Sequence, residues 1–361
     1  MKTDKILVFA LSLIFSAAAF YECTSYASAP DVVISIRIDS PVMEVNGIET
    51  EIDEGRGTVP VIIDDRAMLP IRAVMDALGG ETVWDCVEEK ISLSLDRVLT
   101  ELEIGRSIAY INGAECPLDA APCIIHDRTM LPVRFIAEGF NLGIAWNNDT
   151  KTVTIVKSYL DEEENRELLG IIPKYAGNPY EEINENIPFF KDYELIPASF
   201  EYYSSLDDLG RCNVCMASVS EDIMPTEKRT GIGMIKPTGW HTVKYDCVSG
   251  KYLYNRCHLI GFQLTGENAN ERNLITGTRY LNTVGMLPFE NTASYCVKNT
   301  DNHVLYRVTP VFEETNLLSL GVLIEAFSVE DMGESLSFCV FCYNVQPQIE
   351  INYADGSSRL E

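Results

Sequence analysis

One histidine, His258, lies at the end of the run Asn-Arg-Cys-His and is followed by Asn273, Asn282 and Glu290. A neutral imidazole accepts a proton from water near pH 7. Mg²⁺ prefers oxygen ligands and keeps several of its waters, so few protein ligands are needed to hold it. One imidazole with amide and carboxyl oxygens is therefore sufficient for metal-assisted hydrolysis of a phosphodiester, although this spacing alone is a weak signal.

Local patterns predict the elements that position these side chains. Residues 253–261 have the pattern of a strand that runs into a turn. Asn273 and Asn282 are about 900° apart at roughly 100° per residue, so on one helix they would point to opposite faces. We therefore expect Asn273 to cap or precede the helix that carries Asn282. Pro288 ends that helix and begins the next, which puts Glu290 in a first turn, where a carboxylate is favoured.

This set of residues resembles the DNA/RNA non-specific endonucleases, the ββα-metal class that includes bacterial DNA-entry nucleases. The hallmark of that family is Asp-Arg-Gly-His, then Asn, then a second Asn nine residues later, then Glu. Arg256 and His258 match the Arg and the His. Asn273 and Asn282 match the two Asn with the spacing intact, and Glu290 matches the later Glu.

The resemblance spans residues 171–356 and implies a role for each matched residue. His258 would be the general base that activates water. Asn282 would be the single direct protein ligand of Mg²⁺, with Mn²⁺ as an alternative ion. Asn273 and Glu290 would hold metal-bound waters or orient the site.

The arginines near the motif have implied roles too, and two positions depart from the family pattern. Arg256 would support the motif or contact phosphate, while Arg279 and Arg229 are candidate substrate contacts. Asn255 stands where the family has Asp, which loses a charge but keeps hydrogen bonding. Cys257 stands where the family has Gly, and it adds a β-carbon at a place where the backbone benefits from freedom.

The N-terminal half contains two copies of one pattern. Segments 66–84 and 128–146 align with a single offset, and each has Leu-Pro-x-Arg followed by Trp-Asp or Trp-Asn. An Asn-Gly pair, a hairpin signal, precedes each segment at residues 46–47 and 112–113. Helical spacing follows each Leu-Pro. The repeat predicts a duplicated unit of strands, a short helix and further strands.

Residues 33–157 resemble the copper amine oxidase N-terminal-like domain, a small α+β module of Gram-positive envelope proteins. The Leu-Pro-x-Arg stretch and the Trp-Asp/Asn pair carry the resemblance. No copper is expected, because His126 is the only histidine of this half and one histidine is no copper site. The resemblance implies association with a cell-wall or envelope component, or a role as a spacer.

The chain begins with the pattern of a signal peptide over residues 1–29. Lys2 and Lys5 precede an apolar run, Ile6–Phe20, and Ala27-Ser28-Ala29 fits a cleavage site. The run is short for a membrane span, and an uncleaved anchor is the alternative. We therefore expect a secreted or envelope-associated protein with no transmembrane span after cleavage.

The charge of the chain is strongly acidic, with a formal net charge of −26. Nucleic-acid binding is driven by Lys and Arg, so a nucleic-acid partner requires a local concentration of positive charge. One stretch, which we call the basic segment, provides it: Lys228, Arg229, Lys236, Lys244, Lys251 and Arg256.

The 11 cysteines leave two alternatives open. Cys212 with Cys215 and Cys339 with Cys342 have zinc-ligand spacing. The second pair lies in an apparent strand, where residues three apart face opposite sides, so that pair is not expected to converge. Core thiols or disulfides are the favoured alternative, with residues 116 and 123 as one candidate pair.

Together these observations predict an α+β protein in which a duplicated module (33–157), a linker or short helix (158–170) and a ββα-metal nuclease domain (171–356) follow one another. The predicted activity is metal-dependent hydrolysis of DNA or RNA, and the sequence does not choose between the two. The alternative is a non-catalytic envelope protein that only binds nucleic acid. The intact His258, Asn273, Asn282 and Glu290 favour the enzyme.

Overall fold

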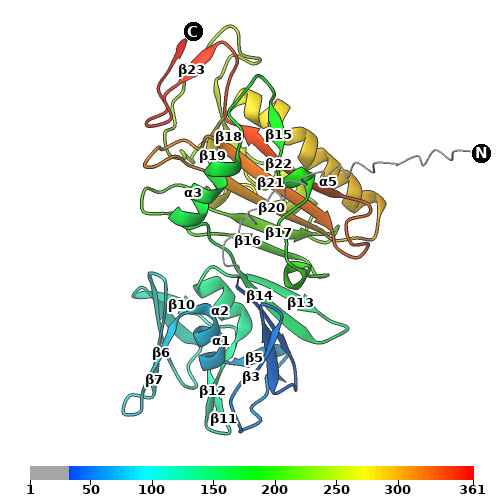
Figure 1. The fold of residues 1–361 in the computed structure, drawn as a ribbon. Coiled ribbons are helices and arrows are strands. Elements are labelled where there is room, and N and C mark those ends of the chain that lie inside the picture. Colours follow the sequence, from blue (N-terminus) through cyan, green and yellow to red (C-terminus); the bar gives the residue numbers. More distant parts are fainter. Residues whose placement is uncertain (1–31) are drawn as a thin grey trace, which may run out of the picture.

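The computed structural model describes residues 32–361, so the predicted signal peptide lies outside the described residues. The described chain forms two lobes, one from residues 32–157 and the other from residues 158–361 (Figure 1). Strands dominate both lobes, and the helices are few. The expected mixed α/β character is confirmed.

The N-terminal lobe consists of three antiparallel sheets and two short helices, α1 (Ile71–Leu78) and α2 (Val133–Gly139). The sheets have the orders β13-β14-β1-β2-β3, β10-β9-β8-β7-β6 and β11-β12-β5-β4. Their strands are β1 (Val32–Arg37), β2 (Val42–Val45), β3 (Ile48–Glu51), β4 (Val61–Ile63), β5 (Arg66–Pro70), β6 (Glu81–Asp85), β7 (Lys90–Leu95), β8 (Val98–Glu103), β9 (Ile108–Ile111), β10 (Ala114–Pro117), β11 (Cys123–Ile125), β12 (Arg128–Pro132), β13 (Gly143–Asn147) and β14 (Thr152–Lys157).

The two sequence copies form equivalent turns and strands in the structure. The Asn-Gly pairs form the β2–β3 and β9–β10 turns, and both residues of each pair have positive φ, as a tight hairpin turn requires. Helix α1 ends at Gly79, whose φ of 78° is the left-handed conformation that glycine adopts without strain. Leu69 of β5 pairs with Leu131 of β12, its counterpart in the other copy, and both side chains are buried. The two copies therefore meet at β5 and β12 and share one apolar cluster.

The C-terminal lobe is built on a six-stranded antiparallel sheet with the order β15-β22-β21-β20-β17-β16. A separate hairpin, β18–β19, precedes a helical stretch that begins as the π-helix η4 and continues as α5. The strands are β15 (Tyr180–Glu182), β16 (Phe200–Tyr203), β17 (Cys215–Val219), β18 (Tyr254–His258), β19 (Leu274–Thr278), β20 (Val304–Val311), β21 (Gly321–Ser328), β22 (Ser337–Tyr343), β23 (Ile349–Ile351) and β24 (Ser358–Leu360). The helices are α3 (Glu162–Ile171), η1 (Asn184–Asn186), η2 (Asp192–Glu194), α4 (Phe262–Thr265), η3 (Glu271–Asn273), η4 (Leu281–Met286) and α5 (Leu287–Asn299).

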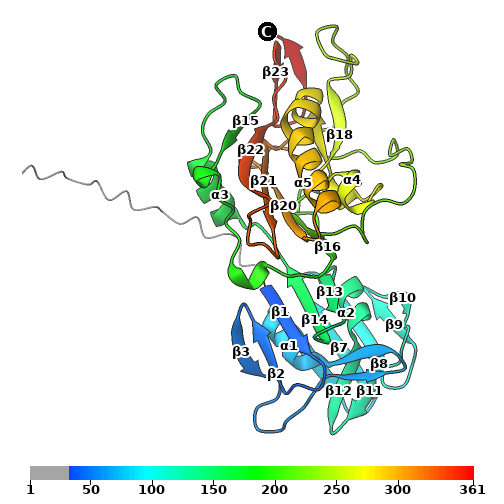
Figure 2. The ribbon, with the colours of Figure 1, turned by 90° about the vertical axis from the view of Figure 1, so that its right-hand side faces the viewer.

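The six-stranded sheet is covered on both faces (Figure 2). Val297 of α5 and Cys257 of the hairpin share one apolar cluster with Cys342, whereas Leu168 of α3 shares another with Cys339. Cys339 and Cys342 therefore lie on opposite faces of β22, as predicted. The core beneath α5 fixes the helix and the hairpin against the same side of the sheet.

The segment predicted as a linker or short helix contains helix α3 and is part of the second lobe. The Asp161 side chain caps α3, and Glu164 completes a capping box. Leu168 is fully buried on the sheet face. The connection is therefore a packed helix, which holds the first lobe close to the second.

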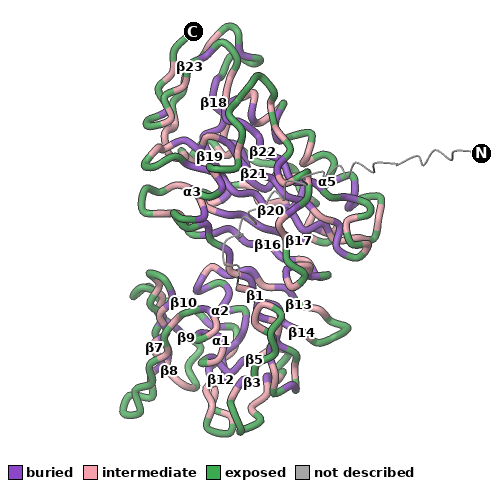
Figure 3. The backbone as a smooth tube through the Cα atoms, viewed as in Figure 1, coloured by how far each residue is buried: buried purple, intermediate pink, exposed green. Residues whose placement is uncertain are grey.

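The two lobes share a buried apolar cluster, visible as buried backbone at their junction in Figure 3. Val156 of the first lobe packs with Phe200 and Tyr202 of β16. A polar link accompanies this cluster, because Asn141 donates from Nδ2 to the carbonyl oxygen of Tyr203 at 2.6 Å and accepts from Arg272. The N-terminal lobe is thus packed against the C-terminal lobe.

All ten cysteines of the described residues are free thiols, so the candidate pair Cys116 and Cys123 is not joined in this structure. These two residues lie on strands of different sheets, β10 and β11. Within residues 32–361 no cluster of three or more His, Cys, Asp or Glu side chains has the geometry of a metal site. In the same range, no helix has both the length and the apolarity that crossing a membrane requires.

Candidate active site

The β18–β19 hairpin positions His258. Its register places His258 opposite Leu274 and Arg256 opposite Thr276. Because side chains alternate along a strand, Arg256 and His258 share one face of the hairpin, and Cys257 points to the other, into the core. The predicted strand that ends in the motif is confirmed.

His258 is held as a neutral imidazole. Its Nε2 lies 2.8 Å from the carbonyl oxygen of Asn268, which only accepts, so Nε2 carries the proton. Its Nδ1 lies 3.0 Å from Nη2 of Arg229, which only donates, so Nδ1 has the free lone pair. Burial, and secondarily the charge of Arg229, lowers the pKa of His258 to about 4, against the opposing effect of the Asn268 carbonyl. The imidazole is therefore neutral at neutral pH, with its Nδ1 lone pair directed at Arg229.

Asn273 is fully buried and forms hydrogen bonds with the turn after His258. Its Oδ1 accepts from the backbone N–H of Ile260 at 2.8 Å, and its Nδ2 donates to the carbonyl of Ile260 at 3.0 Å. Its side chain does not cap the helix that carries Asn282, since β19 lies between the two residues. The amide is thus committed to the backbone and positions the His258 loop.

Asn282 lies near the start of η4 and is half-buried. Within residues 32–361 its side-chain amide has no hydrogen-bond partner, in contrast to that of Asn273. The buried Asn344 fixes the start of this helix, because its Oδ1 accepts from the N–H of Thr278 at 2.9 Å and its Nδ2 donates to the carbonyl of Thr276 at 3.1 Å. An uncommitted amide oxygen on a fixed backbone has the chemistry of a ligand for a hard cation.

Glu290 lies in the first turn of α5, as predicted, and its carboxyl group packs on Gly261, three residues after His258. A β-carbon at Gly261 would lie 2.7 Å from Oε2 of Glu290, so a larger residue there would displace the carboxyl group. Burial raises the pKa of Glu290 to about 7, although Gln263 and the charge of Arg229 act in the opposite direction. A half-buried carboxyl group that has no cation partner is suited to bind a metal ion.

Arg256 binds the backbone of the protein. Its guanidinium donates to the carbonyl oxygens of Ile235 and Gly233 and lies 4.0 Å from the ring centroid of Trp240. These contacts fix the loop that runs over the face of the hairpin shared by Arg256 and His258. Of the two expected roles for Arg256, the observed contacts are those of support for the motif.

Arg279 lies at the other end of the hairpin, beside Asn255. Its Nη1 is 3.4 Å from Oδ1 of Asn255, and its Nε, like Nδ2 of Asn255, is buried with no partner among the described residues. These donors are enclosed and leave little of Arg279 to face a substrate. Its predicted substrate contact stays a prediction.

The departure at Cys257 is accommodated by the facing strand. Cys257 is completely buried, and burial raises the pKa of its thiol, so the group is a neutral core thiol. A β-carbon at Gly277 would lie 2.3 Å from its Sγ. The space that the larger residue needs on β18 is therefore supplied by a glycine on β19.

Some cations of the basic segment have a partner within the protein, and others form no ion pair. Lys244 lies over the ring of Tyr252, and Lys251 pairs with Asp246. Lys228, Arg229 and Lys236 are exposed and form no ion pair with a carboxylate of residues 32–361. The cations that remain available to a phosphate backbone thus lie in the loop that carries Arg229.

The sequence motif assigned no role to three residues that position the site: Asn268, Asn344 and Gln263, whose Nε2 lies 3.5 Å from Oε2 of Glu290. Asn268 acts through its backbone carbonyl, which a sequence pattern does not show. Asn344 stands in the Tyr-Asn-Val-Gln-Pro run near the C-terminus, and a buried asparagine after a strand was the available signal.

Comparison with known families gives two matches. Residues 192–329 match the family model described as DNA/RNA non-specific endonuclease. The predicted resemblance to that family is confirmed. Residues 56–155 match the copper amine oxidase N-terminal domain, the second predicted resemblance.

Similar solved structures are nucleases. NucA from Streptococcus agalactiae with a magnesium ion bound is 23% identical over 55% of this chain and 95% of that chain, with a TM-score of 0.47. The same protein with no metal bound is 24% identical over 56% and 97%, with a TM-score of 0.47. The Sda1 nuclease with a bound zinc ion is 27% identical over 45% and 80%, with a TM-score of 0.40. No curated protein matches the chain.

Proposed function

We propose that the protein is a secreted or cell-surface endonuclease that hydrolyses phosphodiester bonds of DNA or RNA with a divalent cation. The observation that carries this proposal is the state of His258: a neutral, buried imidazole whose Nδ1 lone pair faces an arginine in a nuclease-family segment. Such a nitrogen accepts the proton of an attacking water. The β18–β19 hairpin followed by η4 and α5 supports a ββα-metal arrangement of the site.

The residues of the site fit a hard divalent cation. Asn282 offers an uncommitted amide oxygen, and Glu290 offers a carboxyl group that lacks a cation partner. Both donors are oxygens, which suits Mg²⁺ or Mn²⁺ better than a soft ion. When bound, the cation would stabilise charge on the phosphate and on the leaving oxygen. NucA, one of the similar structures, is described with magnesium bound.

The protein residues would bind the phosphate, accept the proton from water and hold the loops around His258. Arg229 leaves Nδ1 of His258 and binds the phosphate of the entering strand, because a phosphate oxygen is a stronger partner for a guanidinium than a neutral imidazole. His258 takes the proton from water at Nδ1 while Nε2 keeps its bond to Asn268. Asn273 and Arg256 hold the loops on either side of the imidazole.

A metal titration of digestion tests the metal part of the proposal. Double-stranded DNA, single-stranded DNA and RNA are incubated with the protein at rising Mg²⁺ or Mn²⁺. We expect cleavage that EDTA stops and that Asn282→Ala weakens by raising the required metal concentration. Asn299→Ala, a change at the far end of α5, is the matched control. Cleavage that persists in EDTA contradicts the metal role.

The duplicated module supports a location at the cell envelope. Its likeness to the copper amine oxidase N-terminal domain and the signal-peptide pattern of residues 1–29 are the observations behind this part of the proposal. The module is packed against the nuclease-like lobe through Val156 and Phe200. The enzyme and its envelope module therefore act as one body, and binding of the secreted chain to isolated cell walls tests this placement.

A further inference from the structure

A cavity of about 280 Å³ lies beside the catalytic hairpin and is not used by the mechanism above. Three segments line it: residues 206–212, residues 234–238 and residues 271–275. Its walls are mixed, with apolar side chains such as Leu206, Met234 and Ile275 and the charged groups of Lys236 and Glu271. Its size suits one planar heterocycle with its sugar.

The cavity is next to the proposed general base. Leu274, one of its lining residues, is paired with His258 across the hairpin, and paired residues lie about 5 Å apart between α-carbons. Ile235, another lining residue, accepts from Arg256 on the same face of the hairpin. A nucleic-acid strand whose phosphate reaches His258 therefore brings a neighbouring base to the mouth of this cavity.

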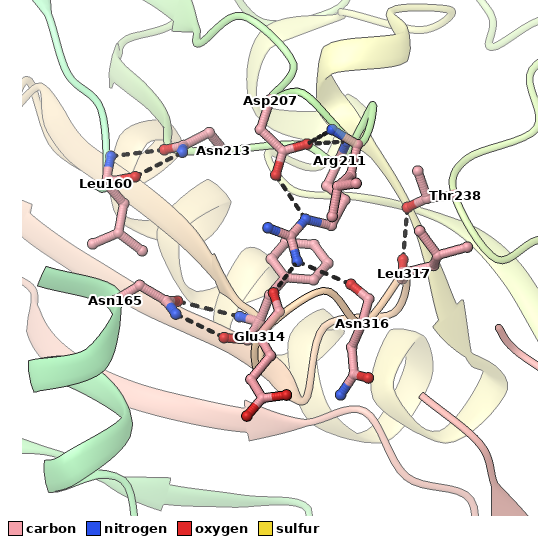
Figure 4. Close-up of polar contacts among 11 residues, drawn as sticks. Leu160, Asn165, Asp207, Arg211, Asn213, Thr238, Glu314, Asn316 and Leu317 are labelled. Carbon is pink, nitrogen blue, oxygen red and sulfur yellow. Dashed lines mark hydrogen bonds and ion pairs between the residues drawn. The ribbon is translucent and has the colours of Figure 1, made fainter. Parts of the chain in front are cut away.

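The walls of the cavity are held by hydrogen bonds, as Figure 4 shows. Arg211 bonds to Asp207 at 2.7 Å, donates to the carbonyl oxygens of Glu314 and Asn316, and stacks on Phe312. These contacts fix the 206–212 wall. On the opposite wall Thr238 donates to the carbonyl oxygen of Leu317 at 2.6 Å.

The third lining segment, residues 271–275, is also held by hydrogen bonds. Cys212 donates from its thiol to the carbonyl oxygens of Glu271 and Leu274, at 3.3 and 3.2 Å. The cavity is thus preformed, as binding sites for small planar groups commonly are. A loose surface hollow would lack such bonds on each of its sides.

We propose that this cavity binds a nucleobase of the substrate strand next to the cleaved phosphate and prefers bases with an exocyclic amino group. Glu271 is exposed and forms no ion pair within residues 32–361, so its carboxylate is available to accept from such an amine. Met234 is 73% exposed and provides an apolar surface for the face of the base.

This inference rests on the proposed nuclease function, and sequencing of cleavage ends separates the two. A DNA library of random sequence is partly digested by the full chain with Mg²⁺, and the bases that flank each cut are counted. We expect cytosine, adenine or guanine, the bases with an exocyclic amino group, to exceed thymine at one flanking position by about threefold or more, since one amine contact discriminates modestly at an exposed rim.

Glu271→Gln removes the charge with little change of shape, and we expect it to reduce this bias to less than about twofold. Glu334→Gln, at an exposed site on a distant turn, is the matched control and should keep the wild-type bias. Met234→Ala should weaken the bias as well. Equal base composition at the cut ends, or an unchanged bias in Glu271→Gln, overturns the subsite. A wild-type protein that does not cut at all contradicts the proposed function itself.

Discussion

Nη2 of Arg229 lies 3.0 Å from Nδ1 of His258, so the guanidinium covers the nitrogen that must accept a proton from water. The two residues are 29 positions apart in the sequence and meet because the loop that carries Arg229 runs over the hairpin. Burial and, to a smaller extent, the charge of Arg229 lower the pKa of His258, and the contact holds the imidazole in one tautomer. In the mechanism we propose, substrate entry and activation of the base would therefore be coupled.

The first prediction concerns this contact. Arg229→Met removes a positive charge beside His258, and we expect the pKa of His258 to rise above its value of about 4. The variant should also bind DNA more weakly, and the slope of log affinity against log salt should decrease by about one. Titration of the imidazole signals by NMR measures the pKa, with Lys228→Met as the control. An unchanged pKa in Arg229→Met is evidence against the contact.

The second prediction concerns pH and stability in the absence of metal. His258 has a folded pKa of about 4, below its ordinary 6.5, so the unfolded chain takes up the proton first. The contribution of His258 to the free energy of unfolding is therefore complete above pH 6.5 and falls as the pH falls toward 4. Glu290 has a folded pKa of about 7, above its ordinary 4.5. Its contribution is complete below pH 4.5 and falls as the pH rises toward 7.

Between pH 4.5 and 6.5 the two slopes oppose each other, each at about 1.4 kcal/mol per pH unit at its steepest. Relative to the wild type, we expect His258→Gln to lose stability and Glu290→Gln to gain stability as the pH rises through this window. Urea unfolding in EDTA at several pH values gives the two difference curves. Difference curves with the same sign of slope would show that one of these pKa shifts has the wrong direction.

The third prediction concerns the match between Cys257 and Gly277. Gly277→Ala should destabilise the protein by about 1–3 kcal/mol, because its methyl group overlaps the buried thiol. Cys257→Gly removes the thiol, and the double variant should recover most of the loss. A double-mutant cycle of unfolding free energies measures the coupling. Strict additivity of the two changes would mean that the strands do not accommodate one another.

The sequence predicted local features well. The Asn-Gly turns and the place of Glu290 in a first turn follow from backbone preferences of a few neighbouring residues. The strand that runs into a turn at the motif was also predicted, and it is β18.

Contacts between distant segments were not predictable in this way. The double hydrogen bond of Asn273 with Ile260 and the burial of Arg256 against Trp240 depend on how the chain returns to the hairpin. The packing of the supposed linker is a similar case, because Leu168 becomes a core residue only when β20–β22 form the sheet beneath it. No local pattern encodes such partners.

The most direct test of the account is the initial rate of plasmid cleavage in Mg²⁺ by His258→Ala, compared with the wild type. Far-UV circular dichroism and an unchanged elution volume establish that the variant is folded. We expect a loss of at least about 100-fold, the size of a general-base contribution, while His241→Ala, a change at a histidine bonded only to the carbonyl of Asp355, keeps the wild-type rate. A folded His258→Ala that cleaves at the wild-type rate would contradict the assignment of His258 as the base.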